Sequence, residues 1–196
     1  DKDIVNALIA TEDARFYDHS GVDVKAIGRS VTGVFIGGKG GGSTITQQLA
    51  KMMFPREKLS KPELIIRKLK EWIIATRLER YYTKEEILAL YLNKFDFLNL
   101  AVGIKSAAQI YFNREQDSLR IEQAAMLVGM AKNPSLFNPI RFADTTLHRR
   151  NVVLNQMVKY GYLSKEKYDS LKILPLGLAF RPENHNDGPA PYFREY

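Results

Sequence analysis

The sequence is dominated by signals that start helices. Residues Ser60–Glu63 and Thr83–Glu86 both have the spacing of a capping box, in which a hydroxyl side chain and a glutamate three residues later accept each other's backbone N–H groups. Apolar residues recur at helical spacing from Leu64 to about Tyr82 after the first box, and through Tyr91 after the second. The sequence shows neither a convincing alternating strand pattern nor an internal repeat. It therefore predicts an all-α fold.

Further helices are expected near the N-terminus and in the second half of the chain. Val5, Leu8 and Phe16 follow helical spacing after a polar start. We also expect helices over residues 121–131, 147–160 and 165–171, the last of them capped by Ser164.

The C-terminal part of the sequence is typical of a linker. From Pro175 onward the chain holds half of its eight prolines, in a polar segment. We therefore place the folded domain at residues 1–172 and a linker at residues 173–196.

The composition allows one sizeable core and favours an anionic partner. The 196 residues are 45% hydrophobic, enough for a single core that can be divided into lobes. A formal net charge of +7 favours nucleic acid, phosphate esters or acidic lipid as partners. The absence of cysteine rules out disulfides and thiolate metal sites. No apolar stretch approaches the roughly 20 residues that cross a bilayer, so either the protein is soluble or its anchor lies outside this sequence.

The first candidate site begins at Glu12. This residue falls on the same helical stripe as Phe16 and other apolar residues, so its carboxylate is aimed at the apolar side. Burial disfavours the charged form of a carboxyl group, which is one way to prepare a general base or acid. A solvated glutamate at a helix end, or one paired with Arg15, explains the same spacing. His19 alone is more typical of a structural histidine than of a catalyst.

The second candidate site is a glycine-rich stretch that leads into a helix. Residues 41–51 read Gly-Gly-Ser-Thr-Ile-Thr-Gln-Gln-Leu-Ala-Lys, and a helix that starts there presents N–H groups, hydroxyls and amides to a phosphate or a sugar. Residues 33–39 nearly match a nucleotide-binding P-loop. However, Gly40 stands where that motif needs Ser or Thr for magnesium, and no strand precedes it. A flexible surface loop is the alternative, and a flexible loop beside a site satisfies both interpretations.

The third candidate site lies on the long helix predicted after Ser60. Arg67, Lys70 and Glu71 share one helical face because they are three or four residues apart. Such a pattern is usually a solvated face of paired charges. Here nearby basic residues, Lys51 among them, outnumber the acidic ones, and the cluster is suited to hold a pyrophosphate.

Two further segments, residues 84–93 and 148–154, indicate amphipathic helices with structural roles when each is taken by itself. Together and in this order, the five segments resemble the five motifs of the peptidoglycan glycosyltransferase domain of class A penicillin-binding proteins. The matches are Glu-Asp-x-x-Phe-x-x-His-x-Gly-x-Asp at residues 12–23, Gly-Gly-Ser-Thr-Ile-Thr-Gln-Gln at 41–48, Arg-Lys-x-x-Glu at 67–71, Lys-x-x-Ile-Leu-x-x-Tyr-Leu-Asn at 84–93 and Arg-Arg-Asn at 149–151. The resemblance spans roughly residues 4–172.

The resemblance implies a lysozyme-like helical fold, with a large lobe and a smaller membrane-touching lobe separated by a cleft. It implies that the donor is the growing glycan on undecaprenyl pyrophosphate and that the acceptor is lipid II. The acceptor 4-hydroxyl attacks the donor anomeric carbon with inversion, and the lipid pyrophosphate leaves. Glu12 is then the general base. Glu71 assists departure of the pyrophosphate, with a divalent cation (magnesium or manganese) as an optional helper there.

The same resemblance implies further substrate-binding residues. They are Asp13, Arg29, Ser43, Thr44, Gln47, Gln48, Lys51, Arg67, Lys70, Asn93 and Arg150. Among these, Lys51, Arg67 and Lys70 would neutralise phosphates.

One base beside a cationic cluster fits glycosyl transfer better than hydrolysis. A glycosidase needs a carboxyl group kept neutral as an acid, whereas pyrophosphate leaves as a stabilised anion that cations can assist. The alternatives are a lysozyme-like hydrolase of the same polymer and a basic helical nucleic-acid-binding module. The basic residues cluster around a carboxylate and a glycine loop rather than along a recognition helix, so no nucleic-acid partner is expected.

The resemblance also implies a location and partners. Residues 34–36 and 52–54 are apolar and flanked by Lys and Arg, which suits shallow insertion near anionic headgroups; an ordinary core role is the alternative. We expect the domain at the extracytoplasmic face of the cytoplasmic membrane, with an anchor and a fused transpeptidase domain outside this sequence, and as a target of moenomycin. One departure from the family concerns residues 94–100, which lack the glycines usual after Asn93.

Overall fold

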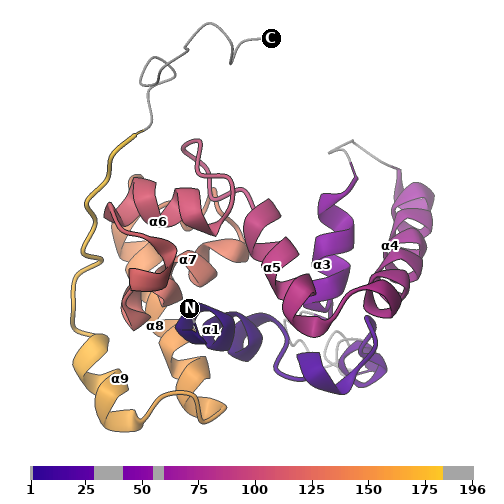
Figure 1. The fold of residues 1–196 in the computed structure, drawn as a ribbon, viewed down its shortest axis with the longest axis horizontal. Coiled ribbons are helices and arrows are strands. Elements are labelled where there is room, and N and C mark those ends of the chain that lie inside the picture. Colours follow the sequence, from indigo (N-terminus) through magenta and orange to yellow (C-terminus); the bar gives the residue numbers. More distant parts are fainter. Residues whose placement is uncertain (1, 29–41, 55–59, 183–196) are drawn as a thin grey trace, which may run out of the picture.

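The computed structural model describes residues 2–28, 42–54 and 60–182 of the chain. Within these residues the secondary structure is helical, apart from one isolated antiparallel bridge between Asp96 and Val102. The helices are α1 (Lys2–Glu12), α3 (Ile45–Met52), α4 (Lys61–Tyr81), α5 (Lys84–Lys94), α6 (Ile104–Phe112), α7 (Ile121–Ala131), α8 (Ala143–Lys159) and α9 (Lys165–Leu171), with short 3-10 turns at Phe16–Asp18 and Gln116–Ser118. The expectation of an all-α fold is confirmed (Figure 1).

Side-chain caps fix where several of these helices begin. The backbone N–H of Ser60 donates to the Glu63 carboxylate at 2.7 Å before α4. The same bond, from Thr83 to Glu86, has a length of 2.7 Å before α5. Both bonds satisfy backbone donors that a helix start leaves without partners, so the two predicted capping boxes are confirmed.

The predicted helix bounds in the second half of the chain are close to those of the structure. The predictions over residues 121–131 and 165–171 match α7 and α9 residue for residue. Helix α8 starts at Ala143, one turn before the predicted start at residue 147. Its first turn continues with Asp, Thr and Thr, so the apolar pattern that marks a helix in sequence begins only after that turn.

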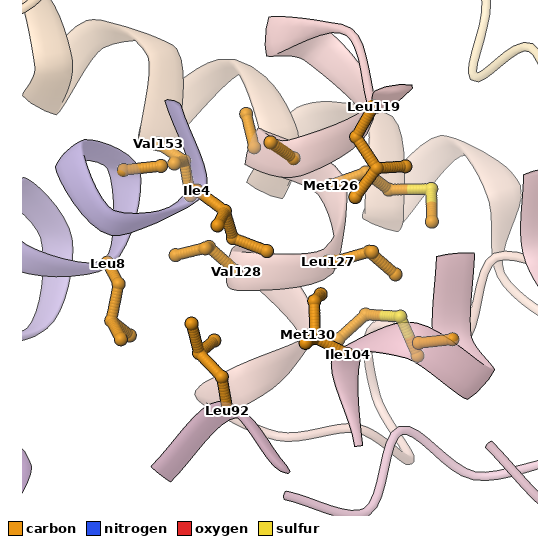
Figure 2. Packing of buried hydrophobic residues seen from close by; sticks show 14 of the residues in the cluster. Ile4, Leu8, Leu92, Ile104, Leu119, Met126, Leu127, Val128, Met130 and Val153 are labelled. Atoms are coloured by element: carbon orange, nitrogen blue, oxygen red, sulfur yellow. The ribbon is translucent and has the colours of Figure 1, made fainter. Parts of the chain in front are cut away.

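Helix α7 lies at the centre of the larger part of the molecule. Its residues 122–130 are all buried, and α1 and α8 pack against it. Figure 2 shows Ile4 and Leu8 of α1, Leu92 of α5 and Val153 of α8 around the side chains of α7. Burial of this apolar surface is the main favourable term in folding, and it fixes the position of α1.

Helices α3 and α4 form a smaller part beside α5. Helix α3 packs against both α4 and α5, and Figure 1 shows these three helices on the side of α1 away from α6, α7 and α8. The loop after α1 joins the two parts at Gly21, which has a φ of 90°. A Cβ at this position would lie 2.7 Å from the carbonyl oxygen of Ala75 on α4, so only glycine allows this approach. The carbonyl of Gly21 also accepts a bond of 2.6 Å from Thr44 Oγ1, just before α3.

The predicted domain boundary at residue 172 is too early. Residues 173–182 follow α9 in an extended path along α6 (Figure 1). The N–H of Ala179 donates to Tyr111 O at 2.9 Å, and the N–H of Arg181 donates to Ile110 O at 2.8 Å. Leu176 is buried in the core cluster. Proline content alone therefore misassigned a segment that is part of the folded domain, and residues 183–196 lie outside the described residues.

The turn after α5 has a left-handed backbone, which usually favours glycine, but it contains no glycine. Leu98, Asn99 and Leu100 have φ angles of 64°, 52° and 66°. Left-handed backbone destabilises a non-glycine residue by roughly 1–2 kcal/mol. Surrounding bonds hold the turn, because Leu98 N–H donates to Asp96 at 2.8 Å and Asn99 donates to the hydroxyl of Tyr111 at 2.9 Å. The turn is therefore left-handed at residues 98–100 although residues 94–100 contain no glycine.

Within the described ranges, no helix combines the length and the apolar character needed to span a bilayer.

Candidate active site

Glu12 is the last residue of α1 and faces the junction between the two parts of the molecule. The apolar residues before it anchor the helix in the core, and the Glu12 side chain is 14% exposed. A carboxylate at the C-terminal end of a helix lies at the negative end of the helix dipole. Both burial and the dipole disfavour its charge, so it needs partners from other elements.

Two side chains from different helices hold the two oxygens of this carboxylate. Gln48 of α3 donates its Nε2 to Glu12 Oε2 at 3.0 Å. Arg149 of α8 places its Nη2 3.4 Å from Glu12 Oε1. Glu12 is therefore an embedded, partnered carboxylate, and the alternatives of a solvated glutamate or a pair with Arg15 do not apply, since Arg15 pairs with Asp23.

Tyr91 of α5 orients the amide that touches Glu12. Its hydroxyl donates to Gln48 Oε1 at 3.0 Å, which turns the Nε2 of the amide toward the carboxylate. Burial of Tyr91, and then the nearby charge of Glu12, raise the pKa of this hydroxyl well above its usual range. Tyr91 thus keeps its proton and acts as a permanent donor to Gln48.

Asp13 joins α1 to the start of α3. Its carboxylate lies 3.0 Å from His19 Nε2 and accepts the N–H of Ile45 at 3.1 Å. Asp13, predicted to bind substrate, is buried and held by these internal partners, and it also lines the cavity beside Glu12. Its contact with substrate stays a prediction. His19 has the structural role that its sequence context indicates.

Ser43, Thr44 and Gln47 surround the start of α3, and Ser43 and Thr44 also line a cavity. Thr44 and Gln47 are buried and form a third capping box, with bonds of 3.1 and 3.2 Å. Ser43 and Glu12 line a common cavity of about 370 Å³, which the ends of α1 and α8 and the start of α3 enclose. Ser43 also accepts a bond of 3.1 Å from Lys68 Nζ on α4.

Glu71 is a buried carboxylate on α4, with a side chain only 5% exposed. Lys68 Nζ donates to Glu71 Oε2 at 2.8 Å and, through its bond to Ser43, connects Glu71 with the cavity that Glu12 faces. Sequence reasoning did not select Lys68. Its signal was present, because Lys68 lies three residues before Glu71 within the Arg-Lys-x-x-Glu motif.

The other basic residues predicted near Glu71 are more exposed. Lys51 and Lys70 are exposed, and Arg67 is half-buried with its guanidinium 5.3 Å from the centre of the Phe54 ring. Arg29 lies outside the described residues. The roles of these four residues toward phosphates stay predictions.

Two predicted substrate-binding residues lie elsewhere in the fold. Asn93 is exposed and lines a groove between α1, α5 and α6, together with Ile4 and Leu92. Arg150 is fully buried, and its guanidinium donates to the carbonyls of Leu171, Lys172 and Pro175. The prediction for Arg150 therefore needs correction, since its donors hold residues 171–175 in place. The neighbouring residue, Arg149, is the arginine that reaches Glu12.

The described residues do not form a metal site by themselves. They contain no cluster of three or more His, Cys, Asp or Glu side chains with metal-binding geometry. At Glu71 the ammonium of Lys68 already lies against the carboxylate. We therefore derive no step through a divalent cation.

Comparison with known proteins gives consistent matches over most of the chain. The transglycosylase family profile matches residues 1–158. Penicillin-binding protein 1A of Escherichia coli (strain K12) is 43% identical over 172 residues, which cover 87% of this chain and 20% of that protein. Penicillin-binding protein 1F of Bacillus subtilis (strain 168) is 40% identical over 197 residues, covering 100% of this chain and 26% of that protein. The chain thus spans about a fifth to a quarter of the length of these relatives.

A solved structure is also similar. The crystal structure of penicillin-binding protein 1A from Haemophilus influenzae is 38% identical and covers 50% of this chain and 14% of its own, with a TM-score of 0.47.

Replacing Arg150 tests the structural role assigned to it. We expect Arg150→Met to lower the free energy of unfolding by about 3 kcal/mol, because it leaves buried carbonyl groups without donors. Amide hydrogen exchange at Ala179 and Arg181 should accelerate in this variant. The exposed Arg141→Met is the control and should change neither quantity. Unchanged stability in Arg150→Met would contradict the structural role and favour the predicted contact of Arg150 with substrate.

Proposed function

Because the chain belongs to the transglycosylase family, as the glycosyltransferase domain of a class A penicillin-binding protein, we propose that it polymerises lipid II into glycan strands. The observation that carries this proposal is the Glu12 carboxylate, which faces a cavity and is held by Arg149 and Gln48. Ser43 and Lys68 link the same cavity to a second, buried carboxylate at Glu71.

Glu12 acts as the general base in this proposal. It accepts the proton of the acceptor 4-hydroxyl while the oxygen attacks the anomeric carbon of the donor sugar. The new glycosidic bond forms as the bond to the lipid pyrophosphate breaks on the opposite face, so the configuration inverts. A base must be ionised before the reaction, and the cationic partner Arg149 favours that state.

The leaving group explains why the site pairs one base with cations. Undecaprenyl pyrophosphate departs as an anion, and fixed positive charge stabilises the negative charge that develops on it. Lys68 is the described cation nearest to Glu71, and the more exposed Lys51, Arg67 and Lys70 extend the basic surface around it. Glu71 orients Lys68 toward the cavity through their 2.8 Å bond.

The exposed face of α4 supports contact of this domain with a membrane surface. Five large apolar residues on this helix are between 52% and 64% exposed, and they are Leu64, Ile65, Ile66, Leu69 and Ile73. Met53, the residue that follows α3, is 47% exposed as well. A helix surface of this kind buries its apolar side chains at the headgroup boundary, where exposed lysines such as Lys61 and Lys70 meet anionic lipid.

The α4 face adds to the surface that the sequence indicated, residues 34–36 and 52–54, of which Met53 is exposed. Residues 34–36 lie outside the described residues, and Met52 packs partly against the core. We propose that the α4 face holds the domain at the extracytoplasmic face of the cytoplasmic membrane, where lipid II and the lipid-linked glycan lie. We also propose that the full-length protein contains a fused transpeptidase domain, as class A penicillin-binding proteins do.

Polymerisation of labelled lipid II tests the proposed function. Wild type should produce glycan strands and release undecaprenyl pyrophosphate, whereas folded Glu12→Gln should be slower by a factor of about 10²–10⁴, the usual contribution of a general base. Circular dichroism verifies the fold of the variant, and Glu122→Gln, a buried glutamate of α7, is the control.

Cleavage of glycan without release of lipid pyrophosphate would favour the hydrolase, which the family match does not support. Salt-sensitive binding of duplex DNA with no reaction of lipid II would favour the nucleic-acid module.

Vesicle binding tests the membrane surface. The triple variant Ile65→Gln, Leu69→Gln and Ile73→Gln should bind vesicles of acidic phospholipid at least about tenfold more weakly, because apolar area is lost from the contact. Its stability should stay within about 0.5 kcal/mol of wild type, since these side chains are exposed. Ile173→Gln removes an isoleucine outside α4 that is 76% exposed, more than the three residues of the triple variant, and serves as the control. Equal binding by the triple variant and wild type would contradict the proposal.

A further inference from the structure

Arg149 is the charged residue that contacts Glu12, the proposed base. The two residues are 137 positions apart in the sequence. It lies on α8, its side chain is 10% exposed, and its Nη2 is 3.4 Å from Glu12 Oε1. We propose that Arg149 is a positioning residue that keeps Glu12 ionised and fixed in the cleft before substrate binds. This inference rests on the proposed function and goes beyond it by assigning a specific task to the first arginine of the Arg-Arg-Asn element.

The first step of the argument is the need for a cation. Glu12 lies at the C-terminal end of α1 and is largely removed from water, and both conditions disfavour a negative charge. The contact from Gln48 is a hydrogen bond from a neutral side-chain amide, so it supplies no positive charge. Arg149 is the group in the described structure that forms an ion pair with Glu12. Without it, the carboxyl group would take up a proton more readily and lose its capacity to act as a base.

The second step concerns how rigidly Arg149 itself is held. Its Nε lies 3.3 Å from the carbonyl oxygen of Gly129 on α7, and its guanidinium carbon lies 5.7 Å from the centre of the Phe137 ring. A Cβ on Gly129 would lie 3.2 Å from Arg149 Cγ, so the glycine makes room for the side chain. The guanidinium is therefore positioned by the fold in the absence of substrate.

The third step separates the tasks of the two partners of Glu12. At 3.0 Å, the bond from Gln48 is within the usual range for a hydrogen bond and sets the direction of Oε2. At 3.4 Å, the contact from Arg149 is longer than an ideal charged hydrogen bond, so its main contribution is charge. Burial lowers the pKa of Arg149, whereas the charge of Glu12 raises it, so the carboxylate favours the charged form of the guanidinium.

Other charged groups around Glu12 are already paired. Asp13 is bound to His19, and Arg15 is bound to Asp23, in the segment that follows α1. From α5, the buried hydroxyl of Tyr91 faces Gln48 and keeps its proton. These groups remain unchanged when Arg149 is replaced, so a change in the acid side of the activity profile reports on the Arg149–Glu12 pair.

The test is the pH dependence of lipid II polymerisation by wild type, Arg149→Met and Arg149→Lys. In Arg149→Met we expect the acid limb of the kcat profile to move to higher pH, because the cation that favours the carboxylate is gone. KM should stay within about twofold of wild type, since the proposed role of Arg149 acts through Glu12 and includes no contact with substrate. Arg149→Lys should restore most of the wild-type profile. Arg120→Met is the matched control, because it removes an arginine that pairs with the buried Glu122 of α7, away from Glu12.

The outcomes distinguish this inference from the proposed function. Wild type that forms no polymer contradicts the function itself. Active wild type together with an unshifted profile in Arg149→Met, or an equal shift in Arg120→Met, overturns the role of Arg149 alone. Gly129→Ala keeps the charge but displaces Arg149 Cγ, and provides a second variant if Arg149→Met does not fold. For Gly129→Ala we expect a several-fold lower kcat with unchanged KM, whereas wild-type kcat in this variant would count against the proposal.

Discussion

The arrangement of the site depends on one partly buried negative charge at the end of a helix. Glu12 needs a cation and a directed donor, and neither is available on α1 itself. Arg149 comes from α8 and Gln48 from α3, so the larger and smaller parts of the molecule both contribute to one carboxylate. The packing of α1 against α7 and α8 makes this meeting possible, because it fixes the end of α1 where the other two helices can reach it. The Glu12 carboxylate is unfavourable without these partners, so α1, α3 and α8 must pack together around it.

The long helix α4 connects the chemistry of the cleft with the proposed membrane surface. Its inward face carries the buried Glu71, whose partner Lys68 reaches Ser43 at the start of α3. Its outward face carries large apolar side chains that the fold leaves exposed. Close contact at Gly21 holds this helix against the loop that follows Glu12. In the proposed function, this one helix contacts the membrane through its outward face and places a cation beside the cleft through its inward face.

Local signals in the sequence predicted most of the helices, although not α6, and they could not specify long-range partners. The capping boxes at Ser60 and Thr83 depend on residues three positions apart, so their geometry follows from the sequence. Arg149 and Arg150 are neighbours in sequence, yet one faces Glu12 and the other holds residues 171–175. Which arginine faces the cleft depends on the rotation of α8 against α7, and no local pattern encodes it.

The apolar spacing of α4 illustrates a second limit. Leu69 and Ile73 follow helical periodicity and resemble a core-facing stripe, but they are exposed in this fold. Periodicity identifies an apolar face without identifying what covers it. The segment after α9 shows the converse, because its prolines indicated a linker while Leu176 and the main chain at Ala179 and Arg181 pack on α6 and the core.

The most direct test of this account is a double-mutant cycle between Glu12 and Arg149, measured by denaturant unfolding at neutral pH. The free energies of unfolding of wild type, Glu12→Gln, Arg149→Met and the double variant give the coupling energy of the pair. A partly buried ion pair on which the site depends predicts a favourable coupling of about 1–3 kcal/mol, so that Arg149→Met destabilises the protein much less when Glu12 is already glutamine. Additive effects of the two substitutions would contradict the central role given to this interaction.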